Sequence, residues 1–193
     1  MNMPIDDPRQ EAILGAAWQC FAAYGFRKTT MDDIARGAGM SRPALYQHYR
    51  SKEDIFRRLA QLFYDEAAAG LARALSGSGD PPAALQAAFL AQGGRIAEAM
   101  LGSPHGMELL DTSKATAGDI AETGEARLRL IYADWLETGR AEGRLTFEGD
   151  AGALASTITR ALKGMKSDCI DFDTYKASLA QLARVMGRGL SAG

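Results

Sequence analysis

The sequence of 193 residues has little of what several protein classes require. Its two cysteines, Cys20 and Cys169, are far apart, with no CxxC pair and no nearby histidine. We therefore expect buried or free thiols rather than a zinc site or a disulfide framework. No apolar run reaches the roughly 18 residues of a membrane-spanning helix. The N-terminus lacks the basic and then apolar layout of a signal peptide, so we expect a cytoplasmic protein with no membrane partner.

Enzyme motifs are also missing. The sequence contains no GxSxG, no HExxH and no phosphate-binding loop. Its only two histidines, His48 and His105, are far apart, which is poor equipment for acid–base or metal chemistry. We therefore predict that the protein is not an enzyme and has neither a cofactor nor a metal site.

The distribution of charge is more informative than its total. The net charge of −2 argues against an indiscriminate coat on nucleic acid. From Arg27 to Arg58, eight basic residues stand against four acidic ones, whereas from residue 61 onward 13 basic residues stand against 17 acidic ones. One segment therefore attracts phosphate and the remainder does not.

Helical spacing of apolar residues recurs along the whole chain, and strand signals are almost absent. The apolar face from Ile13 to Tyr24 predicts a first helix that ends at Gly25. A capping-box-like Thr30-x-x-Asp33 starts a second helix, which ends at a Gly39 turn. Further capping residues start the third and fourth helices, at Ser41 and Ser51. The pattern is that of a helix-turn-helix, although an ordinary helical hairpin is the alternative.

The rest of the chain also has helical patterns. The fourth helix runs to Leu75 and is followed by a loop at 76–82. Pro81 and Pro82 are expected to open a helix that continues to Met100, and later helices are expected between the 102–106 break and Gly139, at 154–165 and at 172–186. Gly93-Gly94 predicts a kink or a ligand-facing gap. The near-heptad spacing of the last helix suits packing between partners. We predict an all-α fold of about nine helices.

The third helix carries side chains suited to a DNA major groove. Arg42 could bind guanine and Gln47 adenine, and Pro43 and Ala44 offer an apolar surface to a thymine methyl group. For Arg42 and Gln47 the alternative is simple solvation.

Other side chains are placed for the DNA backbone. Tyr46, His48 and Lys52 are expected at phosphates, and Lys52 is reinforced by the amides that start the fourth helix. Tyr46 could instead pack against the first helix, and His48 could be a surface histidine. The predicted DNA-binding residues are Thr29, Thr30, Ser41, Arg42, Pro43, Ala44, Tyr46, Gln47, His48 and Lys52.

Residues 13–56 resemble the N-terminal domain of the TetR family of transcriptional regulators. The resemblance covers 44 of 193 residues. Two positions depart from the family pattern, since Cys20 stands where leucine is usual and Tyr49 where phenylalanine is common. The matching residues are Phe21, Gly25, Thr29-Thr30, Ile34-Ala35, Ala38-Gly39-Met40-Ser41 and Leu45-Tyr46-x-His48-Tyr49-x-Ser51-Lys52-Glu53.

The resemblance implies an all-α homodimer with two domains. Residues 1–51 would be the helix-turn-helix DNA-binding domain and residues 52–193 the helical ligand-binding and dimerisation domain. The last two helices would form a four-helix bundle with those of a second protomer. Plain core packing is the alternative for each predicted ligand-lining residue: Phe89, Met100, His105, Met107, Tyr132, Trp135 and Met165.

The leading hypothesis is a ligand-responsive repressor. A dimer would bind a near-palindromic operator in double-stranded DNA, and a small-molecule effector would release it. The alternative is an architectural or protein-partner factor that binds DNA through the same fold without a ligand. A cavity in the C-terminal domain would separate the two hypotheses.

Overall fold

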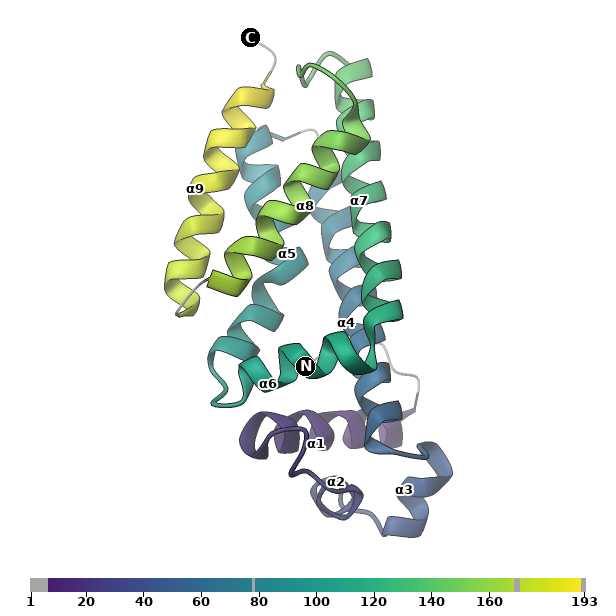
Figure 1. Ribbon diagram of the computed structural model, residues 1–193. Helices are drawn as coiled ribbons and strands as arrows, with labels where there is room; N and C mark the ends of the chain where they lie inside the picture. Colours follow the sequence, from purple (N-terminus) through teal and green to yellow (C-terminus); the bar gives the residue numbers. More distant parts are fainter. Residues whose placement is uncertain (1–6, 78, 169–170, 192–193) are drawn as a thin grey trace. The chain divides into compact units, whose positions relative to one another are not determined.

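The computed structural model describes residues 7–77, 79–168 and 171–191. Within these ranges the chain forms nine α-helices, and its only extended pairing is an isolated bridge between Leu145 and Ser191. The prediction of an all-α fold is therefore confirmed (Figure 1). The helices are α1 (Pro8–Tyr24), α2 (Met31–Gly37), α3 (Arg42–His48), α4 (Lys52–Leu75), α5 (Pro81–Leu101), α6 (Gly106–Thr116), α7 (Gly118–Ala141), α8 (Ala151–Asp168) and α9 (Phe172–Leu190).

The single long helix expected between the 102–106 break and Gly139 is wrong. The segment forms two helices, because the backbone of Ala117 (φ −134°, ψ 29°) leaves the helical conformation between α6 and α7. The carbonyl oxygen of Thr116 at this break accepts a hydrogen bond of 2.8 Å from Arg57 Nη1. A side chain 59 positions away thus bonds a carbonyl that the end of α6 leaves free.

The glycine pair in α5 provides room for packing. The helix is continuous from Pro81 to Leu101, and Gly93 is buried. A Cβ atom at Gly93 would lie 2.7 Å from the hydroxyl oxygen of Tyr175 in α9. Gly93 therefore faces a closely packed tyrosine rather than a gap, and the predicted kink is not needed to account for it.

The chain divides into two compact units. Unit 1 comprises the residues up to Tyr64 together with Ala99–Glu122. Three aromatic rings, from Phe21, Phe26 and Phe56, lie at its centre, with centroids 5.2–5.8 Å apart. The surrounding buried residues include Ile13, Leu14, Ile34, Leu45, Ile55 and Leu109. The core thus joins α1–α4 with α6, while the domain boundary predicted between residues 51 and 52 remains a prediction.

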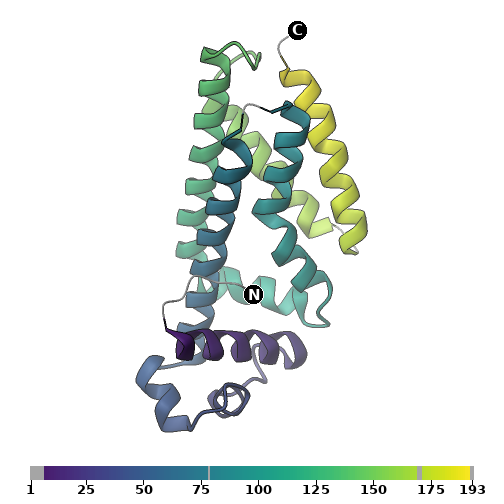
Figure 2. The ribbon, with the colours of Figure 1, turned by 180° about the vertical axis from the view of Figure 1, so that it is seen from behind.

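Unit 2 comprises Asp65–Glu98 and the chain from Thr123 onward. Its α8 and α9 lie side by side in both views (Figures 1 and 2). Gly187 permits a close approach of α9 to α5, since a Cβ atom there would clash with the backbone of Pro82. Its core contains residues from each of its five helices, including Leu71, Leu85, Phe89, Leu128, Tyr132, Leu136, Ile158 and Leu179.

The thiol Cys20 is free and partly buried, and burial raises its pKa. The other cysteine, Cys169, lies outside the described residues. No helix in the described ranges is long and apolar enough to cross a membrane. The same residues contain no group of three or more His, Cys, Asp or Glu side chains that could hold a metal ion.

Candidate DNA-binding surface

The α2–turn–α3 segment is built by local capping. Thr30 Oγ1 accepts a hydrogen bond from the amide of Asp33 (3.2 Å), and Asp33 Oδ2 accepts one from the amide of Thr30 (3.0 Å). The predicted capping box is therefore confirmed. Gly39 takes the left-handed conformation (φ +67°) that the turn between the helices requires. Ser41 Oγ then accepts from the amide of Ala44 (3.4 Å) and starts α3.

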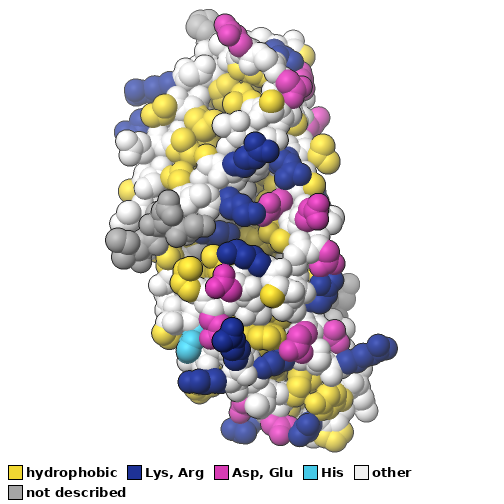
Figure 3. All heavy atoms as spheres, viewed as in Figure 1, with side chains coloured by type: hydrophobic (Ala, Val, Ile, Leu, Met, Phe, Trp, Pro, Cys, Tyr) yellow, Lys and Arg dark blue, Asp and Glu magenta, His cyan; other side chains and the backbone are white. Residues whose placement is uncertain are grey.

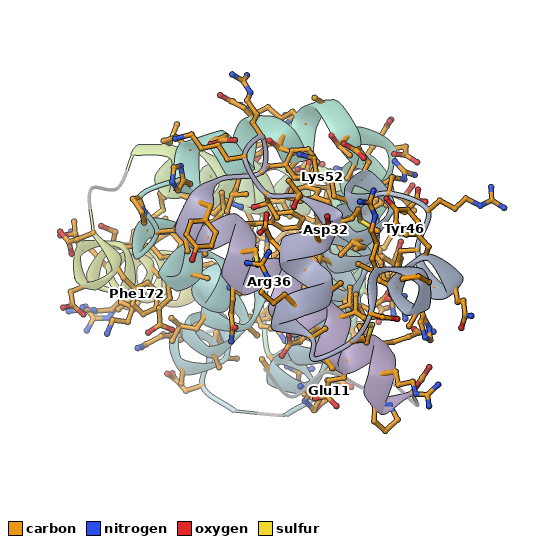
Figure 4. All side chains as sticks on the ribbon, turned by 90° about the horizontal axis from the view of Figure 1, so that it is seen from below. Glu11, Asp32, Arg36, Tyr46, Lys52 and Phe172 are labelled. Atoms are coloured by element: carbon orange, nitrogen blue, oxygen red, sulfur yellow. The ribbon has the colours of Figure 1, made fainter. Side chains whose placement is uncertain are left out.

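One face of α3 is buried and the other is exposed. Leu45 has no exposed area and packs into the core of unit 1. The outward face carries Arg42, Pro43, Tyr46 and Gln47, all of them exposed. Figure 4 looks onto this side of unit 1, with Tyr46 on α3 and Asp32 and Arg36 on α2. The structure thus presents Arg42, Pro43 and Gln47 of the predicted base-contacting residues on one accessible surface, whereas Ala44 is partly buried.

Arg42 is held by two neighbours on this surface. Its guanidinium lies 3.2 Å from Asp32 Oδ2 and 5.5 Å from the centre of the Tyr46 ring. The Tyr46 hydroxyl, 3.4 Å from Arg42 Nη2, and the nearby Asp32 carboxylate raise the pKa of the guanidinium. The Tyr46 side chain is 42% exposed, so it points toward solvent and is not buried against α1.

Lys52 has a different place from the one predicted. Its ammonium group donates to the carbonyl oxygens of Phe26 (2.8 Å), Arg27 (3.1 Å) and Thr29 (2.9 Å), and it lies 4.7 Å from the centre of the Phe26 ring. An ammonium group has three N–H donors, and all three are used. We therefore correct the predicted phosphate contact: Lys52 joins the start of α4 to the turn between α1 and α2.

The two threonines before α2 also differ from each other. Thr29 is 1% exposed, and its hydroxyl donates to the carbonyl oxygen of Gly25 at 2.7 Å. Its side chain is therefore not available to DNA, which corrects its predicted backbone contact. Thr30 is exposed but caps α2, and its hydroxyl donates to Asp33 Oδ2 at 2.6 Å. His48 is partly buried in the last turn of α3.

Residues in and just before α6 also bond the end of α1 and the turn between α1 and α2, which the sequence did not predict. Glu108 Oε1 in α6 accepts a hydrogen bond from the amide of Arg27 at 2.9 Å, and Glu108 Oε2 lies 3.3 Å from His105 Nδ1. The Arg27 amide is the first cause of the lowered pKa of Glu108. Ser103 Oγ, just before α6, donates to the carbonyl oxygen of Ala22 at 2.8 Å. No local pattern could have indicated contacts between residues 81 positions apart.

Arg57 forms a bidentate salt bridge within unit 1. Its two terminal nitrogens each lie 2.7 Å from a carboxylate oxygen of Asp119. This bidentate pair ties α4 to the start of α7 and lowers the pKa of Asp119 to about 2.

Several exposed basic residues of the helix-turn-helix segment are missing from the predicted set. They include Arg27 and Lys28 in the α1–α2 turn, Arg50 between α3 and α4, and Arg36 on α2, whose side chain is 79% exposed. Figure 3 shows basic side chains interspersed with acidic ones over the part of the surface formed by these helices. The excess of basic residues between Arg27 and Arg58 had signalled them, and their exposure marks them as candidates for phosphate contacts.

The seven predicted ligand-lining residues are divided between the two units. Met100, His105 and Met107 belong to unit 1, where Met107 is 67% exposed. The other four, Phe89, Tyr132, Trp135 and Met165, belong to unit 2. Their role in ligand binding therefore stays a prediction, and the exposed Met107 side chain is not enclosed by other residues.

Two of the four in unit 2 share a core that contains a polar pair. The rings of Phe89 and Tyr132 have centroids 6.3 Å apart. The Tyr132 hydroxyl donates to Gln92 Oε1 at 2.9 Å, and burial raises its pKa well above the ordinary value.

Trp135 instead borders a groove of about 670 Å³ between the end of α4 and α7. The groove is lined by apolar residues including Leu75, Leu130 and Ile131 and by charged ones including Arg127, Asp134 and Arg144.

Comparison with known proteins agrees with the geometry of unit 1. Residues 13–59 match the family model described as bacterial regulatory proteins, tetR family. Residues 13–59 are thus similar to the DNA-binding segment of the TetR family. Among curated TetR-family relatives, the transcriptional activator FasR of Mycolicibacterium smegmatis is 37% identical over 87 residues, which are 45% of this chain and 39% of FasR. The transcriptional repressor KstR2 of Mycobacterium tuberculosis is 36% identical over 83 residues, which are 43% of this chain and 42% of KstR2.

The likeness beyond the N-terminal part is one of fold. The chain spans about two fifths of the length of these two relatives. A solved structure of the ketosteroid transcriptional regulator KstR2 of M. tuberculosis aligns with a TM-score of 0.63 over 98% of this chain and 97% of KstR2, at 24% identity. The TetR fold thus extends along the chain, while sequence similarity is concentrated in the helix-turn-helix.

Proposed function

We propose that this protein is a sequence-specific DNA-binding transcriptional repressor of the TetR family. In this proposal it acts as a homodimer on a near-palindromic operator and is released by a small-molecule effector. The observation that carries it is the accessible face of α3, where Arg42 and Gln47 are exposed opposite the buried Leu45. A helix that packs into the core on one face and exposes polar side chains on the other can insert into the major groove. Repression is supported by relatives such as KstR2 and Rv1474c, although FasR is an activator.

The proposed domain arrangement assigns residues 1–51 to DNA and residues 52–193 to effector binding and dimerisation. Support for dimerisation comes from α9, where Val185 is 66% exposed beside the exposed Arg184 and Arg188. The near-heptad spacing of the apolar residues of α9 also suits packing against a partner helix. Measurement of the mass in solution at micromolar concentration tests this, and a monomer would contradict it.

The decisive experiment is selection of random duplex DNA on the full-length protein, followed by binding assays on the enriched site. We expect a near-palindrome whose half-sites lie about 34–36 Å apart or slightly more. Arg42→Ala or Gln47→Ala should each weaken binding by about 1–3 kcal/mol and relax preference at one position per half-site. Arg73→Ala, which removes an exposed arginine from the last turn of α4, is the control. Wild-type affinity in both α3 variants would show that another surface contacts the bases.

A ligand-independent DNA-binding factor is the second candidate. The two functions differ in linkage, because an effector that weakens operator binding must bind more weakly to the operator complex by the same factor. Effector titration with and without operator measures that factor. Equal affinities in the two titrations would favour the ligand-independent function.

A further inference from the structure

A lysine continues the buried face of α8 in unit 2. The most deeply buried residues of this helix are 0–4% exposed and recur every three or four positions: Ala151, Ala155, Ile158 and Leu162. The same spacing carries this face to Met165 and Lys166, and both are partly buried. The side-chain stem of Lys166 thus starts where the helix pattern would place an apolar residue.

The nearby carboxylate is already paired. Glu125 Oε1 on α7 lies 2.8 Å from Lys163 Nζ, and the Lys163 side chain is 63% exposed. Among the side chains that the structure describes, none forms a hydrogen bond or an ion pair with Lys166. Two ammonium groups, those of Lys163 and Lys166, therefore lie in the field of Glu125.

The environment of Lys166 penalises its charge. Burial lowers its pKa, the attraction of Glu125 opposes this change, and the repulsion of Lys163 adds to it. Loss of hydration thus outweighs the nearby carboxylate. Hydrogen bonds to an ionised partner are roughly twice as strong as neutral ones, so an anion that replaced the lost water would bind this ammonium firmly.

We propose that Lys166 binds the anionic head group of the effector, and that the effector is an organic anion with an apolar body. This inference rests on the proposed function, in which the C-terminal part of the chain binds an effector. Met165 precedes Lys166 on the same face of α8 and supplies an apolar contact for the body of the ligand. Carboxylates and phosphates share the required chemistry, and the test separates them.

The test uses the full-length protein without DNA and four probes with the same ten-carbon chain: decanoate, decyl phosphate, decanol and decyltrimethylammonium. Calorimetric titration below the micellar concentration should show binding of at least one anion and much weaker binding of the alcohol and the cation. Lys166→Met should lower the affinity for the anion about tenfold, equivalent to about 1.4 kcal/mol, and Lys166→Arg should retain it. Lys163→Met removes the same charge from an exposed side chain and should change the affinity less than about threefold.

Three results would overturn the proposal: no binding of either anion, decanol bound as tightly as the anions, or equal anion affinity in wild type and Lys166→Met. Equal affinity would mean that the ammonium group only reaches solvent from a partly buried stem. Thermal melting checks that Lys166→Met is folded, and Lys166→Gln serves as a second neutral variant. Operator binding is measured separately, so its absence with intact anion binding would count against the proposed function and leave Lys166 as an anion site.

Discussion

Units 1 and 2 are stabilised in different ways. In unit 1, charged side chains from distant parts of the sequence bond backbone groups: Lys52 and Glu108 hold the α1–α2 turn, and Arg57 bonds the break between α6 and α7. In unit 2, helices approach closely where side chains are absent. Gly93 faces Tyr175, and Gly187 faces Pro82.

The difference matches what each unit is proposed to do. Hydrogen bonds are directional, so the bonds of unit 1 fix the backbone at the entrance to α2. A DNA-contacting segment gains affinity when it is held in place before binding. Close packing in unit 2 instead excludes volume and tolerates little added bulk. Four substitutions test this contrast, from the largest expected effect to the smallest.

The largest effect is expected from removing the Lys52 hydrogen bonds of unit 1. Lys52→Met should lower the free energy of unfolding by about 3 kcal/mol, because three carbonyl oxygens lose a charged donor. Urea unfolding measures the change. Lys28→Met, which removes an exposed lysine from the same turn, should cost little. Equal stability of the two variants would mean that the Lys52 bonds do not hold the turn.

The packing of unit 2 is tested at Gly187. Gly187→Ala should destabilise the protein by about 2 kcal/mol, since the new methyl group would meet the backbone of Pro82 and force α5 and α9 apart. Gly189→Ala is the matched control, because a Cβ atom there meets nothing within 4 Å. If both variants melt at the wild-type temperature, the two helices have room to separate.

The buried polar pair of unit 2 should contribute less. Tyr132→Phe removes the hydroxyl that donates to Gln92 and should cost about 1 kcal/mol in chemical denaturation. Tyr24→Phe, at a side chain that is 59% exposed, should be close to neutral. A larger loss for Tyr24→Phe than for Tyr132→Phe would contradict the assignment of Tyr132 to the core.

The smallest effect is expected at Asp119, and it should depend on pH. The pKa of Asp119 is about 2, against an ordinary value of 3.8, because Arg57 bonds its ionised form. The stabilisation is therefore fully present above about pH 3.8 and is lost as the pH falls toward 2. Melting temperatures of wild type and Asp119→Asn should differ at pH 7 and converge in acid.

The control for Asp119 is Asp111→Asn. Asp111 is exposed and pairs with Lys114 within α6, at 3.3 Å. Because this pair joins residues of one helix turn, its loss should change the melting temperature less at pH 7. A difference at Asp119 that persists unchanged at pH 2 would show that the Arg57 pair is not its source.

Sequence patterns predicted the helix-turn-helix better than the remainder. The caps at Thr30 and Ser41 and the turn at Gly39 involve partners within four residues, so their chemistry is visible locally. The break at Ala117 was missed, because alanine favours helix and the conformation there is set by its surroundings. The predicted roles of Thr29 and Lys52 failed for the same reason, since their partners depend on how α1 and α4 pack.

The sequence by itself determined the helical period, the caps and the excess of basic residues around α2 and α3, because each is a property of neighbouring residues. Only the tertiary structure decided that Lys52 and Glu108 bond the same turn, that Gly93 makes room for Tyr175, and that Lys166 continues the buried face of α8. Such contacts join residues tens of positions apart, and burial and hydrogen-bond geometry exist only once the helices have packed.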